Sequence, residues 1–416
     1  MNDILAKLEL NDYDYELPAD KIAVYPAKNR DDSKLLVFNK GEIVHSKFNE
    51  ITNFIPSKSL LVLNTTKVLP ARIKIRRKSG SFIEILLLEP INDKIDYQLA
   101  ALTAKLVEFR CIIGGRNIKE NDVFIEELNI KNVNITLEIS ILKRYENKAD
   151  IRFYWGSQDI TFGQVLEKIG SLPLPPYIKR NLITSDKINY QTIYGTNEGS
   201  VAAPTAGLHF TKEILEDIKI KYKVIDLLLH IGIGTFVPIK EAAIDKHIMH
   251  TERISVSKDT ILTLLTQYIL NNPVIATGTT TLRTLESLYW FGIDLINGLN
   301  IENYKKSSGF CIKQEDIYKD KKDISLEKSF SKIIDFMAEN SLEKIEGRTS
   351  IFIVPGYNIR TIDGLITNFH LPKSTLLLLV SAFIGLDNVN RIYKEALASD
   401  YRFLSYGDGS LLFKFK

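Results

Sequence analysis

The sequence predicts an α/β protein: a large three-layer α/β domain with a smaller all-β barrel domain inserted into it. The chain has 416 residues, which is more than one ordinary hydrophobic core organises, so two domains are expected. In the second half, apolar strand-like runs alternate with Gly- or Thr-rich turns and helical patterns, which is typical of an α/β sheet. Between residues 83 and 153, short β-type runs recur at close spacing, which indicates the all-β unit.

These patterns place the large domain in residues 1–66 and 156–416 and the barrel domain in residues 67–155. The barrel strands are predicted at residues 83–88, 123–125, 135–142 and 151–155. Residues 292–347 are rich in Lys, Asp and Glu and interrupt the strand and helix rhythm. We interpret them as a charged surface insertion.

Composition narrows the class of protein. Hydrophobic residues make up 45% and charged residues 25%, as in a soluble globular protein, and the net charge of +3 means that any basic surface must be local. Cys111 and Cys311 lie far apart, so neither a disulfide framework nor a zinc cluster is indicated, and a reducing cytoplasmic setting fits best. We expect no membrane segment, because the apolar run at residues 376–380 is too short to span a bilayer.

Along the first half of the chain, a polar cluster at residues 29–33 leads into a predicted strand at 35–38, and a second apolar run at 60–63 ends in polar residues. Next comes a strand on which Arg72, Lys74 and Arg76 share one face, because side chains alternate along a strand. The face is either simply solvated or a stripe that contacts phosphates.

The proline-rich stretch at residues 172–180 is predicted to be stiff and extended, because its three prolines forbid a helix. Its end presents Tyr177, Lys179 and Arg180 together. A rigid linker that returns to the large domain is one interpretation, and recognition of a partner is the other.

Residues 199–211 concentrate small residues together with Thr205 and His209, directly before a predicted helix. Such a backbone can approach a ligand closely, since no bulky side chain stands in the way. The alternative is a loop that only turns the chain.

Four predicted strands follow in the second half, at residues 224–230, 274–276, 351–354 and 364–369, and each leads into a polar turn. Ligands of open α/β sheets bind in the crevice at the carboxyl ends of the strands, so the polar side chains at these turns are expected to converge there. They are His230, Thr235, Thr279, Arg283, Asn368 and His370. The dinucleotide and nucleoside-triphosphate fingerprints are missing, which argues against those enzyme classes.

His247, His250 and Glu252 have the spacing of two histidines followed by a carboxylate, which is one pattern of metal ligands. The sequence offers no cysteine or clear third ligand in a fixed context there. We therefore expect no metal, and interpret these residues as a hydrogen-bonded His pair near a substrate or as a surface turn.

Ten segments carry a resemblance to a known family. They read YDYELP, NRDDSKLLV, NTTKVLPARI, LPLPPYIKR, GSVAAPTAGLHFT, LHIGIGTF, MHTE, GTTTLRTLES, DGLITNFHLPKSTLLLLVSAF and YRFLSYGD. In this order they resemble the S-adenosylmethionine:tRNA ribosyltransferase-isomerases of queuosine biosynthesis along nearly the whole chain. The resemblance implies a large α/β domain interrupted by a small β-barrel, in agreement with the pattern above. The segment 292–347 is longer than the resemblance leads us to expect.

The resemblance also implies a reaction. The ribosyl part of S-adenosylmethionine, the cosubstrate, is transferred to 7-aminomethyl-7-deazaguanine at the tRNA wobble position, which gives epoxyqueuosine and releases adenine and methionine. A base must remove the proton that the neighbouring sulfonium acidifies, and an acid must assist the departing adenine. Imidazoles suit both tasks near neutral pH. His209 is the first candidate for the base, with His230 and His370 next, although each histidine could instead be structural.

Further roles follow from the chemistry of the side chains. Asp226, Asp363 and Glu286 are candidates to bind the ribose hydroxyls or orient a histidine. Arg283 and Lys373 are candidates for the methionine carboxylate, and Asn368 for the base or adenine. The other expected substrate-binding residues are Thr205, Thr235, Thr279 and Tyr406.

For the tRNA, the expected backbone contacts are Arg72, Lys74, Arg76, Lys179 and Arg180, and the expected stacking residues are Tyr177 and Tyr406. We expect a monomer. Two alternatives from other classes stay open at this point. One is an RNA-binding paralogue that lacks the transfer reaction, and the other is a methyltransferase, which predicts S-adenosylhomocysteine as the product.

Overall fold

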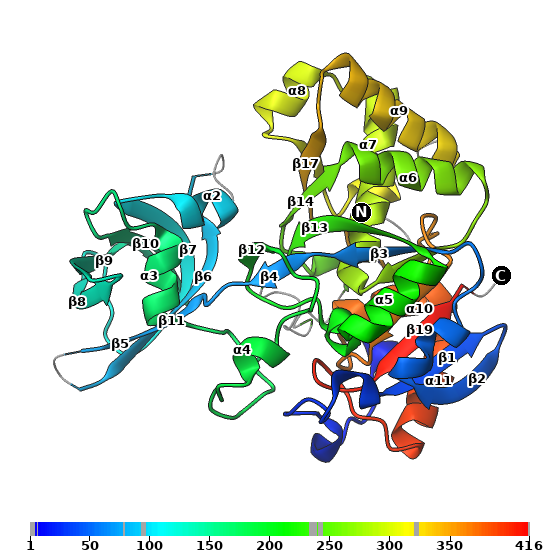
Figure 1. The fold of residues 1–416 in the computed structure, drawn as a ribbon, viewed down its shortest axis with the longest axis horizontal. Helices are drawn as coiled ribbons and strands as arrows, with labels where there is room; N and C mark the ends of the chain where they lie inside the picture. Colours follow the sequence, from blue (N-terminus) through cyan, green and yellow to red (C-terminus); the bar gives the residue numbers. More distant parts are fainter. Residues whose placement is uncertain are drawn as a thin grey trace.

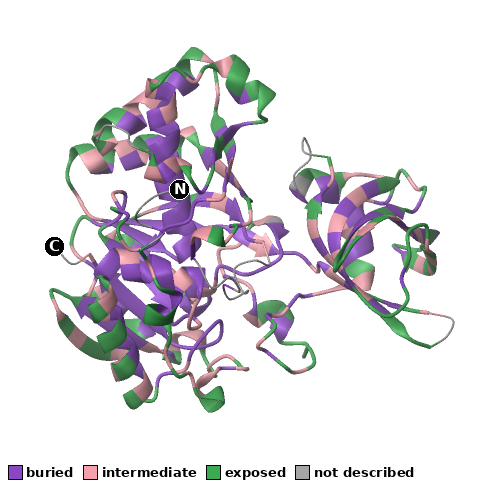
Figure 2. Cartoon of the chain, turned by 180° about the vertical axis from the view of Figure 1, so that it is seen from behind, coloured by how far each residue is buried: buried purple, intermediate pink, exposed green. Residues whose placement is uncertain are grey.

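The computed structural model describes residues 5, 7–77, 80–92, 97–232, 239, 244–319 and 324–414. Figure 1 shows a larger body and a smaller body that is joined to it by a narrow set of segments. Thr235, one of the expected substrate-binding residues, lies outside the described residues. Figure 2 shows that buried residues line the centre of the larger body and the sheet of the smaller one.

The larger body is organised by a mixed sheet. Among the described residues, ten strands form it, in the order β16 (Phe310–Ile312), β17 (Lys344–Thr349), β14 (Glu252–Ser257), β13 (Lys223–His230), β3 (Leu60–Asn64), β15 (Val274–Thr277), β18 (Gly364–Asn368), β19 (Gly409–Phe413), β1 (Lys34–Asn39) and β2 (Glu42–Lys47). The central strands β13, β3, β15 and β18 are parallel, so their carboxyl ends lie at one edge. β19 and β1 run the other way and therefore begin at that edge.

Helices cover both faces of this sheet, because strand side chains alternate between the faces. Leu61 of β3 packs on one face with Ile214 and Ile218 of α5 (Lys212–Lys221). Its neighbours Leu60 and Val62 belong to the core on the other face. The helices on that second face are α6 (Lys258–Ile269), α7 (Thr279–Ile296), α9 (Leu326–Glu339), α10 (Thr375–Ile384) and α11 (Leu386–Ala398). The predicted three-layer α/β domain is confirmed in this sense.

Several helices begin where the sequence places a capping hydroxyl. The Ser374 hydroxyl accepts a hydrogen bond from the Leu377 amide at 3.2 Å at the start of α10, and Gly385 follows its end with a φ of 86°. Thr211 caps α5 in the same way through the Ile214 amide. The stretch at residues 199–211 therefore leads into a helix, after a short 3-10 turn at Thr205–His209.

The smaller body has its own sheet and core. Among the described residues its strands lie in the order β11 (Gly170–Ser171), β5 (Arg72–Arg76), β6 (Phe82–Pro90), β7 (Leu106–Gly114), β10 (Lys148–Tyr154), β9 (Val133–Tyr145) and β8 (Val123–Ile130). Two helices pack on this sheet, α2 (Tyr97–Leu102) and α3 (Phe162–Ile169), and Phe162 stacks on Phe109 and Trp155. The unit therefore contains helices as well as strands and extends beyond the predicted residue 155. Closure into a barrel stays a prediction.

Two short segments link the bodies. β4 (Thr66–Val68) pairs in parallel with β12 (Asn197–Ser200), which brings the chain entering the smaller body beside the chain that has left it. The return path includes the proline-rich stretch at residues 172–180 and the short helix α4 (Asp186–Asn189). The stretch was predicted to be extended throughout, but it contains a turn in which the Ile178 amide donates to the Pro175 carbonyl at 3.0 Å. The narrow link explains the separation of the bodies in Figure 1.

Two features differ from the sequence-based expectations. Residues 351–354 were expected to form a strand. They are buried, but the strand in this part of the chain is β17, which ends just before them at Thr349. The segment 292–347, expected at the surface, contributes α8 (Ile301–Lys306), β16, α9 and β17, and Phe330 and Ile333 of α9 are fully buried where α9 packs on α6 and α7. Its apolar residues at helical spacing were hidden among many charges.

Helix length was compared with what a membrane span requires. Among the described residues, no single helix is long and apolar enough to cross a membrane. The pair α10 and α11 meets the length and composition requirement only when the two helices are taken together, across a bend of 114°.

Candidate active site

Two small cavities adjoin at the carboxyl edge of the central strands. Each has a volume of about 40 Å³, and both are lined by Thr205, His370 and Leu376. Other polar residues that line one or the other are Tyr177, Asn368, Ser374, Ser405, Thr279, Thr280 and Thr367. Three of the side chains expected to converge, Thr279, Asn368 and His370, therefore line these cavities, together with Thr205. The reason is the predicted one, because β15 and β18 are parallel neighbours that end side by side.

One cavity lies at the start of α7. Gly278 follows β15 with a φ of 93°, and Thr279 and Thr280 begin the helix beside it. The first amides of a helix have no partner within the helix, and the helix dipole favours a negative group there. The buried Thr280 Oγ1 also lacks a hydrogen-bond partner among the described residues. This end of the cavity is therefore suited to an anionic or hydrogen-bonding ligand group.

His370 lines both cavities and is held from several sides. Its Nε2 lies 2.9 Å from Thr367 Oγ1, its amide donates to the Tyr393 hydroxyl at 3.0 Å, and its carbonyl accepts from the Tyr15 hydroxyl. Burial lowers the pKa of His370 to about 3. The described residues provide no hydrogen bond to Nδ1. The ring is therefore neutral, and one of its nitrogens is left for a ligand.

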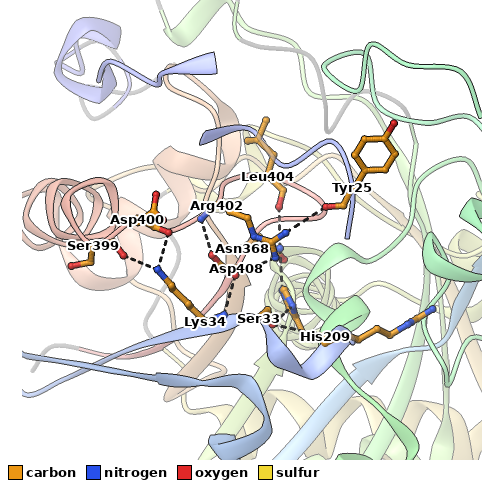
Figure 3. Close-up of polar contacts among 11 residues, drawn as sticks. Tyr25, Ser33, Lys34, His209, Asn368, Ser399, Asp400, Arg402, Leu404 and Asp408 are labelled. Carbon is orange, nitrogen blue, oxygen red and sulfur yellow. Dashed lines mark hydrogen bonds and ion pairs between the residues drawn. The ribbon is translucent and has the colours of Figure 1, made fainter. Parts of the chain in front are cut away.

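His209 does not line either cavity and lies behind Asn368, which lines one of them. Figure 3 shows its ring between Ser33 and Asn368. Asn368 Nδ2 donates to Nε2 at 3.2 Å, so Nδ1 carries the proton and donates to Ser33 Oγ at 2.9 Å. Burial, with the charges of Arg402 and Arg30, lowers the pKa of His209 to about 3. Both ring nitrogens are thus occupied inside the protein, which fits a positioning role for this first candidate base.

Asn368 connects His209 to the cavity. Its Nδ2 also donates to the Leu404 carbonyl at 3.1 Å, which anchors the turn after α11. Its Oδ1 is buried and has no partner among the described residues. An unpaired buried oxygen costs about 1–3 kcal/mol, so its presence in a cavity wall indicates a ligand donor.

Two arginines that the sequence interpretation left without a role flank this cluster. Arg402 bonds Asp408 through its amide at 2.7 Å and its side chain at 3.4 Å, and Asp408 also accepts from the Lys34 amide at 2.9 Å, as Figure 3 shows. Arg30 donates to the carbonyls of Gln191 and Ile188. Both lie in quoted segments, NRDDSKLLV and YRFLSYGD, which were the only signal available.

Arg283 lies one turn into α7 and is buried in an ion pair with Glu252, which also bonds His250 Nε2 at 3.2 Å. Burial alone raises the pKa of Glu252, but Arg283 and His250 lower it below its ordinary value. Arg283 Nε and Nη2 have no partner among the described residues.

The described residues contain no group of three potential metal ligands.

His230, the second candidate base, lines a separate groove. The groove also contains Arg253 and Arg348, and His230 Nδ1 lies 3.5 Å from Thr66 Oγ1. Its next residue, Ile231, lines the cavity at the start of α7. The histidines expected in one cleft therefore lie at neighbouring but distinct places on the same sheet edge.

The structure does not bring the remaining expected substrate residues to the cavities. Asp226 is exposed on β13. Asp363 bonds the Val274 amide at 3.1 Å, at the opposite, amino edge of β15 and β18. Glu286 is buried and accepts hydrogen bonds from Tyr357, Arg360 and Thr361.

Two others are held elsewhere. Lys373 forms an ion pair with Asp14 at 2.8 Å, and Tyr406 is buried with its hydroxyl 3.0 Å from Asp186. Tyr177 donates or accepts a 2.5 Å hydrogen bond with Ser405 in the cavity wall. Buried tyrosine rings are poor stacking platforms for an unpaired base, because a base must reach the ring face.

Comparison with known proteins decides the family. A family model described as "Queuosine biosynthesis protein" matches residues 10–412. A protein of Sulfurihydrogenibium sp. (strain YO3AOP1), named S-adenosylmethionine:tRNA ribosyltransferase-isomerase, is 37% identical over 409 residues, which cover 97% of this chain and all of that protein. One of the same name from Halothermothrix orenii is 39% identical, with the same coverage.

The chain belongs to the S-adenosylmethionine:tRNA ribosyltransferase-isomerase family. This confirms the resemblance stated from the sequence and makes the chain a member of a family of transferases in tRNA modification. The crystal structure of S-adenosylmethionine tRNA ribosyltransferase from Thermotoga maritima is 28% identical, covers 97% of this chain and all of that chain, and superposes with a TM-score of 0.46.

The basic residues expected to contact tRNA fall into two groups, one exposed and one paired with carboxylates. Lys74, Arg76 and Lys179 are exposed. Arg72 is paired with Glu84, and Arg180 with the buried Asp186 through two contacts of 2.7 Å. Arg72 and Arg180 nevertheless line one groove of about 590 Å³ together with Lys179, between the smaller body and the proline-rich stretch.

The two low histidine pKa values predict how stability depends on pH. The rings of His209 and His370 are neutral in the folded protein at pH 5–6.5, whereas in the unfolded chain they become protonated below about pH 6.5. The free energy of unfolding should therefore fall as pH drops from 6.5 to 5, by up to about 1.4 kcal/mol per pH unit for each histidine. Urea unfolding of wild type and of His209→Gln and His370→Gln tests this. Each variant should show a shallower slope below pH 6.5 and an unchanged slope above pH 7.5, and an unchanged acid slope would contradict the prediction.

Proposed function

We propose that this chain transfers and isomerises the ribosyl moiety of S-adenosylmethionine onto 7-aminomethyl-7-deazaguanine at the wobble position of tRNA, forming epoxyqueuosine and releasing adenine and methionine. The observation that carries the proposal is the full-length family match, to relatives that bear the name S-adenosylmethionine:tRNA ribosyltransferase-isomerase. The polar cavities at the carboxyl edge of the sheet support it, since that edge is where open α/β sheets bind small molecules.

S-adenosylmethionine is proposed to bind across both cavities. Each is far smaller than the roughly 300 Å³ or more that ligand sites of this kind occupy, and joined they still fall well short of it. Binding must therefore move their shared wall of Thr205, His370 and Leu376 and also widen the joined space. The start of α7, with Thr279 and Thr280, is suited to the methionine carboxylate. Asn368 Oδ1 is placed to accept from the adenine amino group, which would satisfy an oxygen that is otherwise unpaired.

His370 is the proposed base that removes the proton beside the sulfonium. It lines both cavities, and a proton donated from Nε2 to Thr367 Oγ1 would leave Nδ1 bare as the acceptor. Its low pKa keeps the ring unprotonated, although it also makes the ring a weaker base. A bound sulfonium offsets this weakness, because it acidifies the adjacent proton. His209 then acts through Asn368 by fixing the amide orientation.

The tRNA is proposed to lie across the face where the two bodies meet. Lys74 and Arg76 are exposed on β5 of the smaller body, Lys179 is exposed in the proline-rich stretch, and the groove lined by Arg72 and Arg180 runs between these two parts. Cationic side chains at such positions contact phosphates and set the register of the RNA. An RNA-binding paralogue without the transfer reaction would keep this face as well, so binding alone does not separate the two functions.

The reaction itself separates them. Purified protein is incubated with S-adenosylmethionine and tRNA that carries the aminomethyl-deazaguanine, and free adenine and the epoxide-containing nucleoside are measured by mass spectrometry. Both are expected in equal amounts, with none when the tRNA carries guanine at the same position. Release of S-adenosylhomocysteine instead would indicate a methyltransferase, and tRNA binding without adenine release would leave the RNA-binding paralogue.

A further inference from the structure

The outer face of β13, β14 and β17 carries a row of basic side chains that starts at His230, next to Ile231 in the wall of the cavity at the start of α7. His230 of β13 lies opposite Arg253 of β14, and Arg253 lies opposite Arg348 of β17. Residues directly opposite one another on neighbouring strands point to the same face, and strands lie about 4.8 Å apart. The three side chains therefore form one row, about 10 Å long, across the sheet.

This row lies in a groove open to solvent. The groove, of about 60 Å³, is also lined by Lys344, Glu346 and Ser308. Lys344 pairs with Glu346 at 2.7 Å, and Arg348 donates to the Ser307 carbonyl at 2.9 Å. Among the described lining residues, three side chains are permanently cationic and one is a carboxylate. Lys305 and Lys306, both exposed, precede the turn at Ser307 on the rim.

The groove exists because one face of these strands lacks the helical cover found elsewhere on the sheet. Ile254 and Ile345, which point the other way, are buried in the main core. The core under α5 draws its strand residues from the middle of the sheet and from β1, and none of its described members comes from β14 or β17. Figure 1 shows α5 over the middle of the sheet and β14 and β17 beyond it.

The row also meets the smaller body. The Tyr97 ring at the start of α2 lies 6.1 Å from the His230 ring, centroid to centroid. Burial raises the pKa of Tyr97, and the charge of Arg253 partly opposes this rise, so Arg253 acts on the same point. One end of the row is therefore at the junction of the two bodies, and the other lies at the outer edge of the sheet.

We propose that the groove of His230, Arg253, Lys344 and Arg348 binds the ribose-phosphate backbone of the substrate tRNA. The inference rests on the proposed function and extends it, since it assigns the charge-rich segment 292–347 a role in holding the RNA. A polyanion is the occupant that fits a groove whose described lining holds three permanently cationic side chains and one carboxylate, with Leu228 as an apolar residue on the same face. The groove lies next to the sheet edge at which the tRNA is proposed to react. Among polyanions, the tRNA is therefore the one expected to reach it.

The test measures tRNA affinity and its salt dependence. Arg253→Gln, Lys344→Gln and Arg348→Gln are compared with wild type by fluorescence anisotropy, using labelled tRNA with the aminomethyl-deazaguanine at 50–300 mM KCl. Each lost phosphate contact should weaken binding about 5-fold and lower the slope of log Kd against log salt concentration by about 0.7–0.9. Arg391→Gln is the matched control, an exposed arginine on α11, which Figure 1 places by β1 at the other end of the sheet.

Thermal unfolding is measured for every variant, because Arg348 also bonds the Ser307 carbonyl. If Arg348→Gln does not fold, Arg253→Gln and Lys344→Gln decide the outcome. Unchanged affinity and salt slope in the folded variants would overturn the inference, as would an equal loss in Arg391→Gln. Adenine release by wild type is measured in the same series. If wild type releases adenine and the groove variants bind tRNA as wild type does, only this inference is wrong. If wild type releases no adenine, the proposed function is wrong.

Discussion

Gly199→Ala is expected to lower the rate of adenine release by about 100-fold, the scale on which a 1 Å misplacement at a reacting centre acts. A β-carbon built on Gly199 would lie 2.1 Å from His230 Cε1 and 2.3 Å from Nδ1, well inside contact distance. Gly199 lies at a register shift in β12, between Glu198 and Ser200, which both pair with β4, so we expect the imidazole to move and the flanking backbone to stay. Displacing this ring also disturbs Ile231, which lines the cavity at the start of α7.

The control is Gly114→Ala, since a β-carbon there meets its nearest atoms only at 3.9 Å. That variant should keep the wild-type rate and melting temperature. The His230 Cε1 proton signal in the NMR spectrum reports whether the ring of Gly199→Ala has moved. A folded Gly199→Ala protein with a wild-type rate would show that the position of His230 is not needed for turnover.

Glu252→Ala is expected to destabilise the protein by about 3–5 kcal/mol, because it leaves the Arg283 guanidinium buried without its counter-ion. Two of the nitrogens of Arg283 already lack partners among the described residues, so nothing nearby compensates. Replacing both residues with methionine should cost less than Glu252→Ala, since no unpaired charge is then buried. Urea unfolding at pH 7 measures all three proteins, and a larger loss in the double variant would contradict this account.

The same pair has a pH signature. The pKa of Glu252 in the folded protein lies below its ordinary value of 4.5, so its ionic stabilisation is present above about pH 4.5 and is lost as pH falls through the folded pKa. The difference in free energy of unfolding between wild type and Glu252→Ala should therefore become smaller as the pH falls below about 4.5. Asp217→Ala, which breaks the exposed pair with Lys221 on α5, serves as the control and should leave stability unchanged at either pH.

Much of the fold could be predicted because the signals were local. Alternation of Leu35 to Phe38 between two cores, the buried run at residues 60–63 and the capping serine at 374 each act within a few residues. Of the side chains expected to meet, Thr279, Asn368 and His370 line the cavities, because parallel neighbouring strands end at the same edge whatever their side chains, whereas His230 and Arg283 do not.

Other features depended on distant partners. Glu286 and Asp363 looked as suitable for a ribose as any carboxylate. Glu286 is held by the turn at residues 357–361, however, and Asp363 lies at the amino edge of its strand. Arg30 and Arg402 were overlooked for the complementary reason, since their effect on His209 comes from packing of the two ends of the chain against each other.

By itself, the sequence determined the family, the α/β class and the edge of the sheet at which the polar side chains gather. Ordered motifs and residue periodicity encode these properties directly. The tertiary structure alone decided which histidine lines the cavities and which is sealed behind Asn368, and which arginines remain on an open face. These distinctions depend on burial and on hydrogen-bond partners hundreds of residues apart, and neither is written in the local pattern of a single chain.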